Sequence, residues 1–373
     1  MKVMHIAAAN SITGGGEKHV ADCLCEMSLR GIELALVAPE GGDLEALAHE
    51  LHVAFYPAPI DHGVAAPRTS MVRRAIAEFE PDIVHAHGHR AALFARRADE
   101  KAAQRVVYTF HGIHVDKGML SPVKMTLEKM LLPRTAAFIA TCNADKTRAL
   151  RLKIADPAKI SVIYNGIPAP KTPVAGLFRS QHNIAPDEAL ILSVGRISKP
   201  KNWPGMLRIF ERAVERARQI DGPRLRLVMV CPGAPEQERN LAQLVAEHPF
   251  ADQIILLPRQ EDLSGAYHDA DVFALASLWE ARAYVIVEAL SYGTPVVGYL
   301  IDGSAEAVDT GKSGLLVTRG DEEAFAAALV TLITDPPTAH AYGSYGAREM
   351  MRRFSMDTMI DQLLTLYSSV QNI

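Results

Sequence analysis

Basic side chains follow an apolar run in the second half of the chain. The run ends at Gly195, and Arg196 and Lys201 follow it five residues apart. A guanidinium group offers a planar fork of donors and an ammonium group a point charge, so the two together suit a diphosphate. A solvated charge run at the surface is the alternative interpretation. The segment 193–202 therefore predicts an anion site, with a diphosphate as its ligand.

Two glutamates bracket seven residues further along, at Glu280 and Glu288. Eight residues are a little over two helical turns, so the helical part could bring both carboxylates within reach of one ligand. Glu288 stands in an apolar stretch (YVIVEAL), where an unpaired carboxylate would be costly to bury. Sugar hydroxyls would be suitable partners for it, and a salt bridge within the protein is the alternative.

A glycine-rich turn follows the first apolar run, in the segment 13–17 (TGGGE). Glycines such as Gly15 and Gly16 let the backbone approach a ligand, and the N-terminus of a helix points N–H groups at an anion. The spacing is not that of the dinucleotide fingerprint G-x-G-x-x-G. The turn predicts either phosphate contact or a tight turn without a ligand.

Short apolar runs alternate with amphipathic stretches along most of the chain. This alternation predicts an α/β protein with two Rossmann-like, doubly wound parallel sheets facing a cleft. The first domain is expected over 1–168 and the second over 189–353, joined by a proline-rich linker at 169–188. In each sheet, a ligand is expected at the carboxyl ends of the strands. Residues 331–368 show helical patterns only.

Composition excludes several classes of protein. The 373 residues are 49% hydrophobic and 22% charged, which is typical of a globular protein with two domains. The net charge of −4 argues against general nucleic-acid binding, and no apolar run approaches the length of a membrane span. Four cysteines without a CxxC pair and no export signal predict a cytoplasmic location.

Positive charge is concentrated in one part of the first domain. Residues 65–153 carry 16 basic and 8 acidic side chains. Such an excess could face a phospholipid surface or a phosphorylated acceptor, and an ordinary solvated surface is the alternative. The segment 117–134 mixes methionine and leucine with basic residues, so it could dip into a membrane interface or pack as a core helix. Peripheral membrane contact therefore stays open.

These segments together resemble the retaining nucleotide-sugar glycosyltransferases of family 4, which have the GT-B fold. The resemblance rests on the Arg196…Lys201 pair and on the string SLWEARAYVIVEALSYGTPVV, a Glu-x7-Glu motif that leads into EA-x-x-x-G-x-PVV. It extends to GGGEKHV, PDIVHAHGH, YTFHG, KISVIYNGIP, DADVFALAS and GKSGLLV. FSMDTMIDQLLTLY, within 354–373, resembles the C-terminal helix that crosses back onto the first domain.

The resemblance implies roles for these residues. Arg196 and Lys201 would bind the donor diphosphate and stabilise the leaving group, Glu288 would bind the ribose hydroxyls, and Glu280 would contact the transferred sugar. Gly15 and Gly16 would approach the phosphates, and His111 would lie beside the transferred sugar and the acceptor. From their positions in the motif, four further residues would also contact the donor: Arg282, Ala283, Tyr284 and Val285. A cation that is fixed in advance strongly stabilises the negative charge that develops on a leaving phosphate.

One departure from the family pattern concerns the residues after the first glutamate. Ala281-Arg282-Ala283 stands where Gly-Phe-Gly or a close variant is usual. Those glycines normally let backbone N–H groups touch the phosphate or the sugar. Arg282 could contact an anionic group of donor or acceptor, and a solvent-facing arginine is the alternative.

The resemblance implies a metal-independent glycosyltransferase with no cofactor. Its partners would be a nucleoside-diphosphate sugar and an acceptor that is a glycan, a lipid-linked molecule or a small molecule. His85, His87 and His89 alternate along a strand and could converge on a metal, but the family has none there. Two alternatives stay open: a degenerate GT-B protein that binds nucleotide sugars, and a GT-B nucleotide-sugar 2-epimerase.

Overall fold

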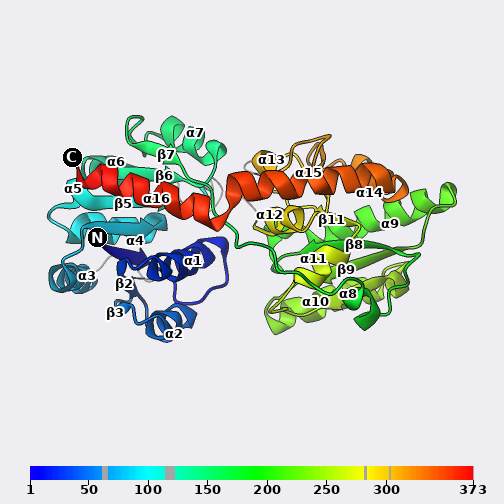
Figure 1. Ribbon diagram of the computed structural model, residues 1–373, viewed down its shortest axis with the longest axis horizontal. Coiled ribbons are helices and arrows are strands. Elements are labelled where there is room, and N and C mark those ends of the chain that lie inside the picture. The colour runs from blue at the N-terminus through cyan, green and yellow to red at the C-terminus, as the bar shows by residue number, and fades with distance from the viewer. Residues whose placement is uncertain (61–65, 114–121, 281–283, 302–303, 373) are drawn as a thin grey trace. The chain divides into compact units, whose positions relative to one another are not determined.

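The chain forms two compact units, each built around one parallel sheet (Figure 1). The computed structural model describes residues 1–60, 66–113, 122–280, 284–301 and 304–372. The first unit consists of Met1–Gly166 and Met356–Ile373, and the second of Ile167–Ser355. The predicted fold class, two Rossmann-like α/β domains, is confirmed.

The sheet of the first unit has seven parallel strands in the order β3-β2-β1-β4-β5-β6-β7. Burial on both faces makes most of these strands nearly continuous apolar runs, as expected for a parallel sheet covered by helices. The strands are β1 (Lys2–Ala7), β2 (Glu33–Ala38), β3 (Ala54–Pro57), β4 (Ile83–His87), β5 (Val106–Phe110), β6 (Ala137–Ala140) and β7 (Ile160–Val162).

Helices cover both faces of this sheet and create two apolar cores. Alternation along β1 sends Met4 and Ile6 into one core and Val3 and Ala7 into the other. The helices are α1 (Gly15–Leu29), α2 (Asp43–Glu50), α3 (Ala66–Phe79), α4 (Gly88–Ala98), α5 (Ala102–Arg105), α6 (Pro122–Leu131) and α7 (Asn143–Leu152), with a 3-10 turn, η1 (Leu132–Arg134).

The last helix of the chain, α16 (Met356–Gln371), packs on this first unit, drawn in red beside the blue and cyan elements of Figure 1. Its apolar face joins the core that contains Val3. Arg30 at the end of α1 holds the helix by two hydrogen-bonded ion pairs of 2.6 Å, to Asp357 and Asp361. A Cβ on Gly166 would lie 2.7 Å from Met356 Cα, so only glycine allows this approach of the chain.

The second unit has a six-stranded parallel sheet in the order β10-β9-β8-β11-β12-β13. Its strands are β8 (Ala189–Val194), β9 (Leu225–Val230), β10 (Ile254–Leu257), β11 (Val272–Leu275), β12 (Val296–Tyr299) and β13 (Gly314–Val317). Its helices are α8 (Leu177–Gln181), α9 (Trp203–Gln219), α10 (Pro235–Ala246), α11 (Ser264–Asp269), α12 (Tyr284–Ser291), α13 (Ser304–Ala307), α14 (Glu322–Thr334) and α15 (Pro336–Phe354), with 3-10 turns η2 (Lys199–Lys201) and η3 (Ala251–Gln253).

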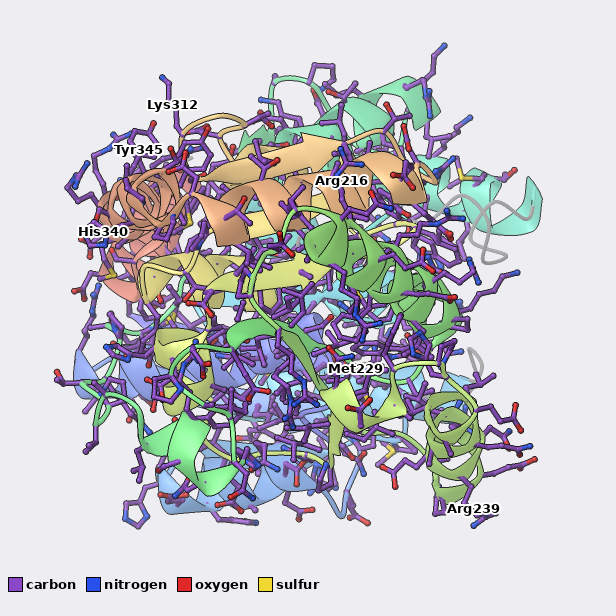
Figure 2. All side chains as sticks on the ribbon, turned by 90° about the vertical axis from the view of Figure 1, so that its right-hand side faces the viewer. Arg216, Met229, Arg239, Lys312, His340 and Tyr345 are labelled. Atoms are coloured by element: carbon purple, nitrogen blue, oxygen red, sulfur yellow. The ribbon has the colours of Figure 1, made fainter. Side chains whose placement is uncertain are left out.

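Figure 2 labels several side chains of this unit. Met229 of β9 is buried in the core, whereas Arg216 lies on the surface of α9 and forms an ion pair of 3.1 Å with Glu323 of α14. Lys312 lies 5.9 Å from the centroid of the Tyr345 ring. Both contacts lie outside the buried core of the unit.

The segment 169–188, predicted as a linker, packs on the second unit instead. It contains α8, whose first turn is bonded to a buried carboxylate of α11. Asp269 accepts hydrogen bonds from the backbone N–H groups of Gly176, Phe178 and Arg179 at 2.8 to 3.3 Å. These bonds satisfy N–H groups that the first turn of a helix leaves without partners.

Among the described helices, none combines the length and the apolar character needed to cross a membrane.

Candidate functional site

The predicted anion site lies at the point where the strand order of the second sheet reverses. β8 and β11 are neighbours in the sheet, and the chain leaves β8 towards β9 on one side but leaves β11 towards β12 on the other. Such a switch point opens a crevice at the carboxyl ends of the strands, where open α/β sheets bind ligands. Arg196 and Lys201 follow β8, and Glu280 follows β11.

The structure brings Lys201 and Glu280 into direct contact. Lys201 Nζ donates to Glu280 Oε1 at 2.6 Å, and both side chains are about 15% exposed. Ser277 Oγ donates to the same oxygen at 2.8 Å. The lysine chain passes over Gly195, where a Cβ would lie 2.9 Å from Lys201 Cε. The first glutamate of the motif is therefore held in place by the lysine of the basic pair.

Backbone contacts tie the two loops together around this ion pair. Asn202 has a left-handed backbone, with φ of 54°, and its side-chain amide donates to the carbonyl of Ala276 at 3.2 Å. Leu278 N–H donates to the carbonyl of Pro200 at 2.8 Å. The loop after β8 is thus fastened to the loop after β11, which fixes the positions of Lys201 and Glu280.

Arg196 has a different environment. Its side chain is exposed and makes no hydrogen bond or ion pair with any residue in the described part of the chain. Its backbone is fixed, because its carbonyl accepts from Trp203 Nε1 at 3.1 Å. A guanidinium group on a fixed backbone, with its donors still open to solvent, is suited to capture an anion.

Glu288 lies in α12, with Tyr284 and Val285 in the first turn of the same helix. Tyr267 Oη donates to Glu288 Oε2 at 2.9 Å. Burial, followed by the charge of Glu288, raises the pKa of Tyr267 well above its usual value, so the hydroxyl keeps its proton. The bond leaves Glu288 Oε1 for another donor. Arg282 and Ala283, predicted to contact the donor, lie outside the described residues.

The predicted residues of the first unit also lie together. Gly15 and Gly16 open α1, after an extended Gly14. A Cβ on Gly16 would be 3.3 Å from Cγ of His111, so the glycine lets the helix start lie against the imidazole ring. His111 is half-buried and follows β5.

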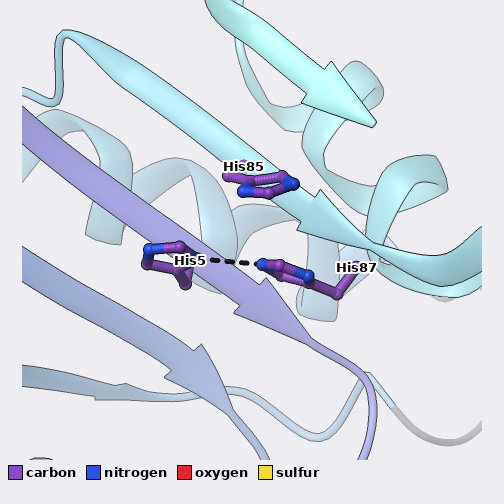
Figure 3. A group of neighbouring side chains, drawn as sticks. All are labelled: His5, His85 and His87. Atoms are coloured by element: carbon purple, nitrogen blue, oxygen red, sulfur yellow. Dashed lines mark hydrogen bonds between the residues drawn. The ribbon is translucent and has the colours of Figure 1, made fainter. Parts of the chain in front are cut away.

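A cluster of histidines surrounds His111. His5, His85 and His87 share one face of the sheet, because they occupy alternate positions on the neighbouring strands β1 and β4 (Figure 3). His19 of α1 adds a fourth ring, 5.1 Å from His111 between centroids. His5 Nδ1 is 2.9 Å from His87 Nε2, and His87 Nδ1 is 3.2 Å from His111 Nε2.

This cluster differs from the one considered from the sequence. His89 does not converge with His85 and His87, because it lies on α4 and is hydrogen-bonded to Glu128. His5 and His19, which come from other elements, were not predicted from the sequence. The strand parity could have found His5, since it shares the face of Val3 and Ala7.

Burial keeps these imidazoles neutral. It lowers the pKa of His5 and of His111 to about 4, and it lowers the pKa of His19, His85 and His87 well below the usual value. The last three are lowered further by the other rings. At neutral pH each ring therefore carries one N–H donor and one acceptor nitrogen.

Two family models match the chain. Residues 13–169 match "Glycosyltransferase Family 4" and residues 176–349 match "Glycosyl transferases group 1". A D-inositol 3-phosphate glycosyltransferase of Stackebrandtia nassauensis is 31% identical over 321 residues, which cover 80% of this chain and 71% of that protein. One of Saccharomonospora viridis is 28% identical over 388 residues, covering 95% and 89%.

Solved structures show the same fold over the whole chain. Anabaena Alr3699/HepE in complex with UDP and glucose superposes with a TM-score of 0.84 at 21% identity, covering 99% of this chain and 100% of that one. Sucrose-phosphate synthase (tll1590) from Thermosynechococcus elongatus gives 0.83 at 20% identity, covering 99% of each chain. The chain belongs to the family 4 glycosyltransferases with the GT-B fold, and it is a nucleotide-sugar-dependent enzyme.

Proposed function

We propose that this enzyme transfers the sugar of a UDP-sugar to an acceptor hydroxyl and releases UDP, with retention of anomeric configuration and without a metal ion. The observation that carries the proposal is the Lys201–Glu280 pair at the switch point of the second sheet. It places a cation for a diphosphate directly beside a carboxylate for sugar hydroxyls. A hydrolase would instead need two carboxyl groups at opposite faces of the sugar.

In this proposal, Lys201 and Arg196 bind the diphosphate and offset the charge that develops as it leaves. Cations fixed in advance at the site of developing charge are usually the largest contribution to such a step. Glu288 accepts hydrogen bonds from the ribose hydroxyls, and the Tyr267 hydroxyl holds its carboxylate in place through Oε2. We assign Arg282, Ala283, Tyr284 and Val285 to the donor as well, on their place in the motif.

We assign His111, Gly15 and Gly16 of the first unit to the transferred sugar, the acceptor and the phosphates. UDP as the nucleotide is supported by HepE, whose structure holds UDP and glucose. An acceptor that carries a negative group is supported by two observations. The similar enzymes are named for inositol 3-phosphate, and residues 65–153 carry an excess of basic side chains. Polysaccharide, glycolipid and secondary-metabolite assembly are the settings that use such a reaction.

A donor panel tests the proposal. Incubation with UDP-, GDP-, ADP- and dTDP-sugars should release free nucleoside diphosphate slowly from a UDP-sugar and not from the others. Glu288→Ala should abolish the release, whereas the matched control Glu215→Ala, at an exposed position of α9, should not change it. Addition of EDTA should leave the rate unchanged.

Two other functions predict different results. A 2-epimerase would change the sugar of the donor without any acceptor, which NMR of the recovered donor would show. A degenerate protein would bind UDP by calorimetry and release nothing from any donor, even with inositol phosphates and glycans supplied as acceptors. Failure of UDP to bind at all would contradict the proposed function.

A further inference from the structure

Three histidines form a continuous hydrogen-bonded chain in the first unit. The chain starts at His5 in the middle of β1, passes through His87 at the end of β4 and reaches His111 after β5. His5 is fully buried, His87 is 6% exposed and His111 is half-buried. The histidine chain therefore leads from the core to the most exposed of its three rings.

The neighbouring rings are not part of this chain. His85 is satisfied separately, by the hydroxyl groups of Tyr367 and Thr109 at 2.6 Å each. His19 Nε2 lies 3.6 Å from Cys23 Sγ. These contacts leave the nitrogen atoms of His5, His87 and His111 to one another.

The central ring imposes one direction on the whole chain. A neutral imidazole has a single N–H, so His87 donates to one neighbour and accepts from the other. If His87 donates to His111, all three rings carry the proton on Nδ1. If His87 donates to His5, all three carry it on Nε2. A mixture within one molecule would break one of the two hydrogen bonds.

The buried end of the chain distinguishes the two directions. His5 Nε2 is buried and has no hydrogen-bond partner among the described residues. Among buried backbone groups, N–H donors without a partner are rarer than carbonyl acceptors that lack one, and we apply the same preference to the imidazole ring. A bare nitrogen is therefore favoured at this position, and the proton of His5 belongs on Nδ1, facing His87.

We propose that the hydrogen bonds of this histidine chain are donated outward, from His5 to His87 and from His87 to His111. The Nδ1–H of His111 is then presented as a hydrogen-bond donor. His5 and His87 are then positioning residues that fix the tautomer of His111. A fixed donor suits a hydroxyl or an anionic oxygen of a sugar or acceptor, and it cannot take the proton of the acceptor hydroxyl at Nδ1. This last consequence rests on the proposed function, whereas the tautomers do not.

A metal ion is the competing occupant of these rings. Nitrogen atoms of His5, His85 and His87, and of His19, His87 and His111, lie within 4.8 Å of one another. No carboxylate in the described chain contacts any of the five rings. A divalent ion held by neutral imidazoles alone would bring its full charge into the core, which is costly without a compensating group. Metal-bound histidines almost always donate their other ring N–H to a carboxylate, a backbone carbonyl or a water molecule.

The test is NMR of the full chain labelled with [15N]histidine, at neutral pH and without substrate. Long-range 1H–15N correlations report which ring nitrogen carries the proton, and the His111 signals are assigned by their loss in His111→Asn. We expect the Nδ1–H form for His5, His87 and His111. The Nε2–H form for any of the three, or a charged ring, would overturn the proposal. Stoichiometric binding of added Zn²⁺ with loss of these signals would overturn it as well.

Two variants of His5 connect the tautomer to turnover. His5→Asn keeps a donor near the position of Nδ1, whereas His5→Leu fills the space without one. We expect His111 to remain in one tautomer in His5→Asn and to populate both in His5→Leu. With a donor sugar found active, kcat should fall about three- to tenfold in His5→Leu only, with the donor KM unchanged. Equal loss in both variants would overturn the positioning role. Should either variant fail to fold, the tautomers of the unsubstituted protein still decide the proposal.

Discussion

Lys201 Nζ lies 2.6 Å from Glu280 Oε1, so the cation of the basic pair and the first glutamate of the Glu-x7-Glu motif form one ion pair. Ser277 shares the same oxygen, and neither charged side chain is more than 16% exposed. The pair is therefore shielded from solvent more than a surface salt bridge. A diphosphate that binds Lys201 has to compete with Glu280 for the ammonium group.

Glu280→Gln tests this competition. The amide keeps the shape of the carboxylate but removes its charge, so we expect UDP to bind about three- to tenfold more tightly, a gain of roughly 1 kcal/mol. Turnover with the UDP-sugar should fall, because the proposed contact to the sugar hydroxyls is weakened. Calorimetry with UDP and a release assay measure the two effects. Weaker binding of UDP would show that the pair organises the phosphate site rather than competing with it.

Arg196→Ala should remove one of the two proposed phosphate cations. We expect kcat/KM for the donor to fall on the order of 10²-fold, as for other fixed groups that stabilise a developing charge. The melting temperature should stay the same, because the Arg196 side chain is exposed. Arg239→Ala, on the exposed surface of α10, is the matched control and should change neither quantity. Unchanged kinetics in Arg196→Ala would remove this residue from the site.

Tyr267→Phe should loosen Glu288. The hydroxyl donates to Glu288 Oε2, and a hydrogen bond to a charged group contributes about 1.5–3 kcal/mol. We expect the donor KM to rise at least fivefold, with a smaller change in kcat, because the carboxylate is assigned to the ribose rather than to the reacting atoms. Steady-state kinetics with varied UDP-sugar measures this. Tyr292→Phe, whose hydroxyl accepts from the backbone N–H of Lys171, serves as the control and should leave KM unchanged.

Protonation of the buried histidines should destabilise the protein in acid. The pKa of His5 is about 4 in the folded chain and near 6.5 when it is exposed by unfolding. Between these values the unfolded chain binds more protons, so the free energy of unfolding falls as the pH decreases from 7 towards 4. Full stability from this group is present above pH 6.5. His5 alone accounts for roughly 3 kcal/mol of this loss.

Urea unfolding at pH 7, 6 and 5 measures the effect. His5→Asn should show a shallower loss of stability with falling pH than the unsubstituted protein. His52→Asn, at an exposed position with a left-handed backbone that asparagine tolerates, should show the same loss as the unsubstituted protein. Parallel pH profiles for His5→Asn and the unsubstituted protein would contradict the assignment of a buried, neutral His5.

Much of the fold could be predicted from local patterns. The runs that became β8 (ALILSV) and β9 (LRLVMV) are apolar at all but one position each, as expected for strands buried on both faces of a parallel sheet. The apolar runs of the first domain predict strands at 3–8, 33–38, 82–85, 105–109 and 136–141, and they miss β3 and β7 at the two edges of the first sheet. β3 ends at an exposed proline and is only half-buried, and β7 has three residues, so neither has the long apolar signal of a central strand.

The sequence by itself determined which residue types carry the chemistry, because the spacing of Arg196, Lys201, Glu280 and Glu288 is fixed along the chain. Only the tertiary structure decided which of them touch. Lys201 and Glu280 meet because β8 and β11 are neighbours at the switch point, although 79 residues separate them. His5 and His111 join one chain only through His87, whose strand lies between theirs. Contacts between distant segments depend on strand order, which no local pattern contains.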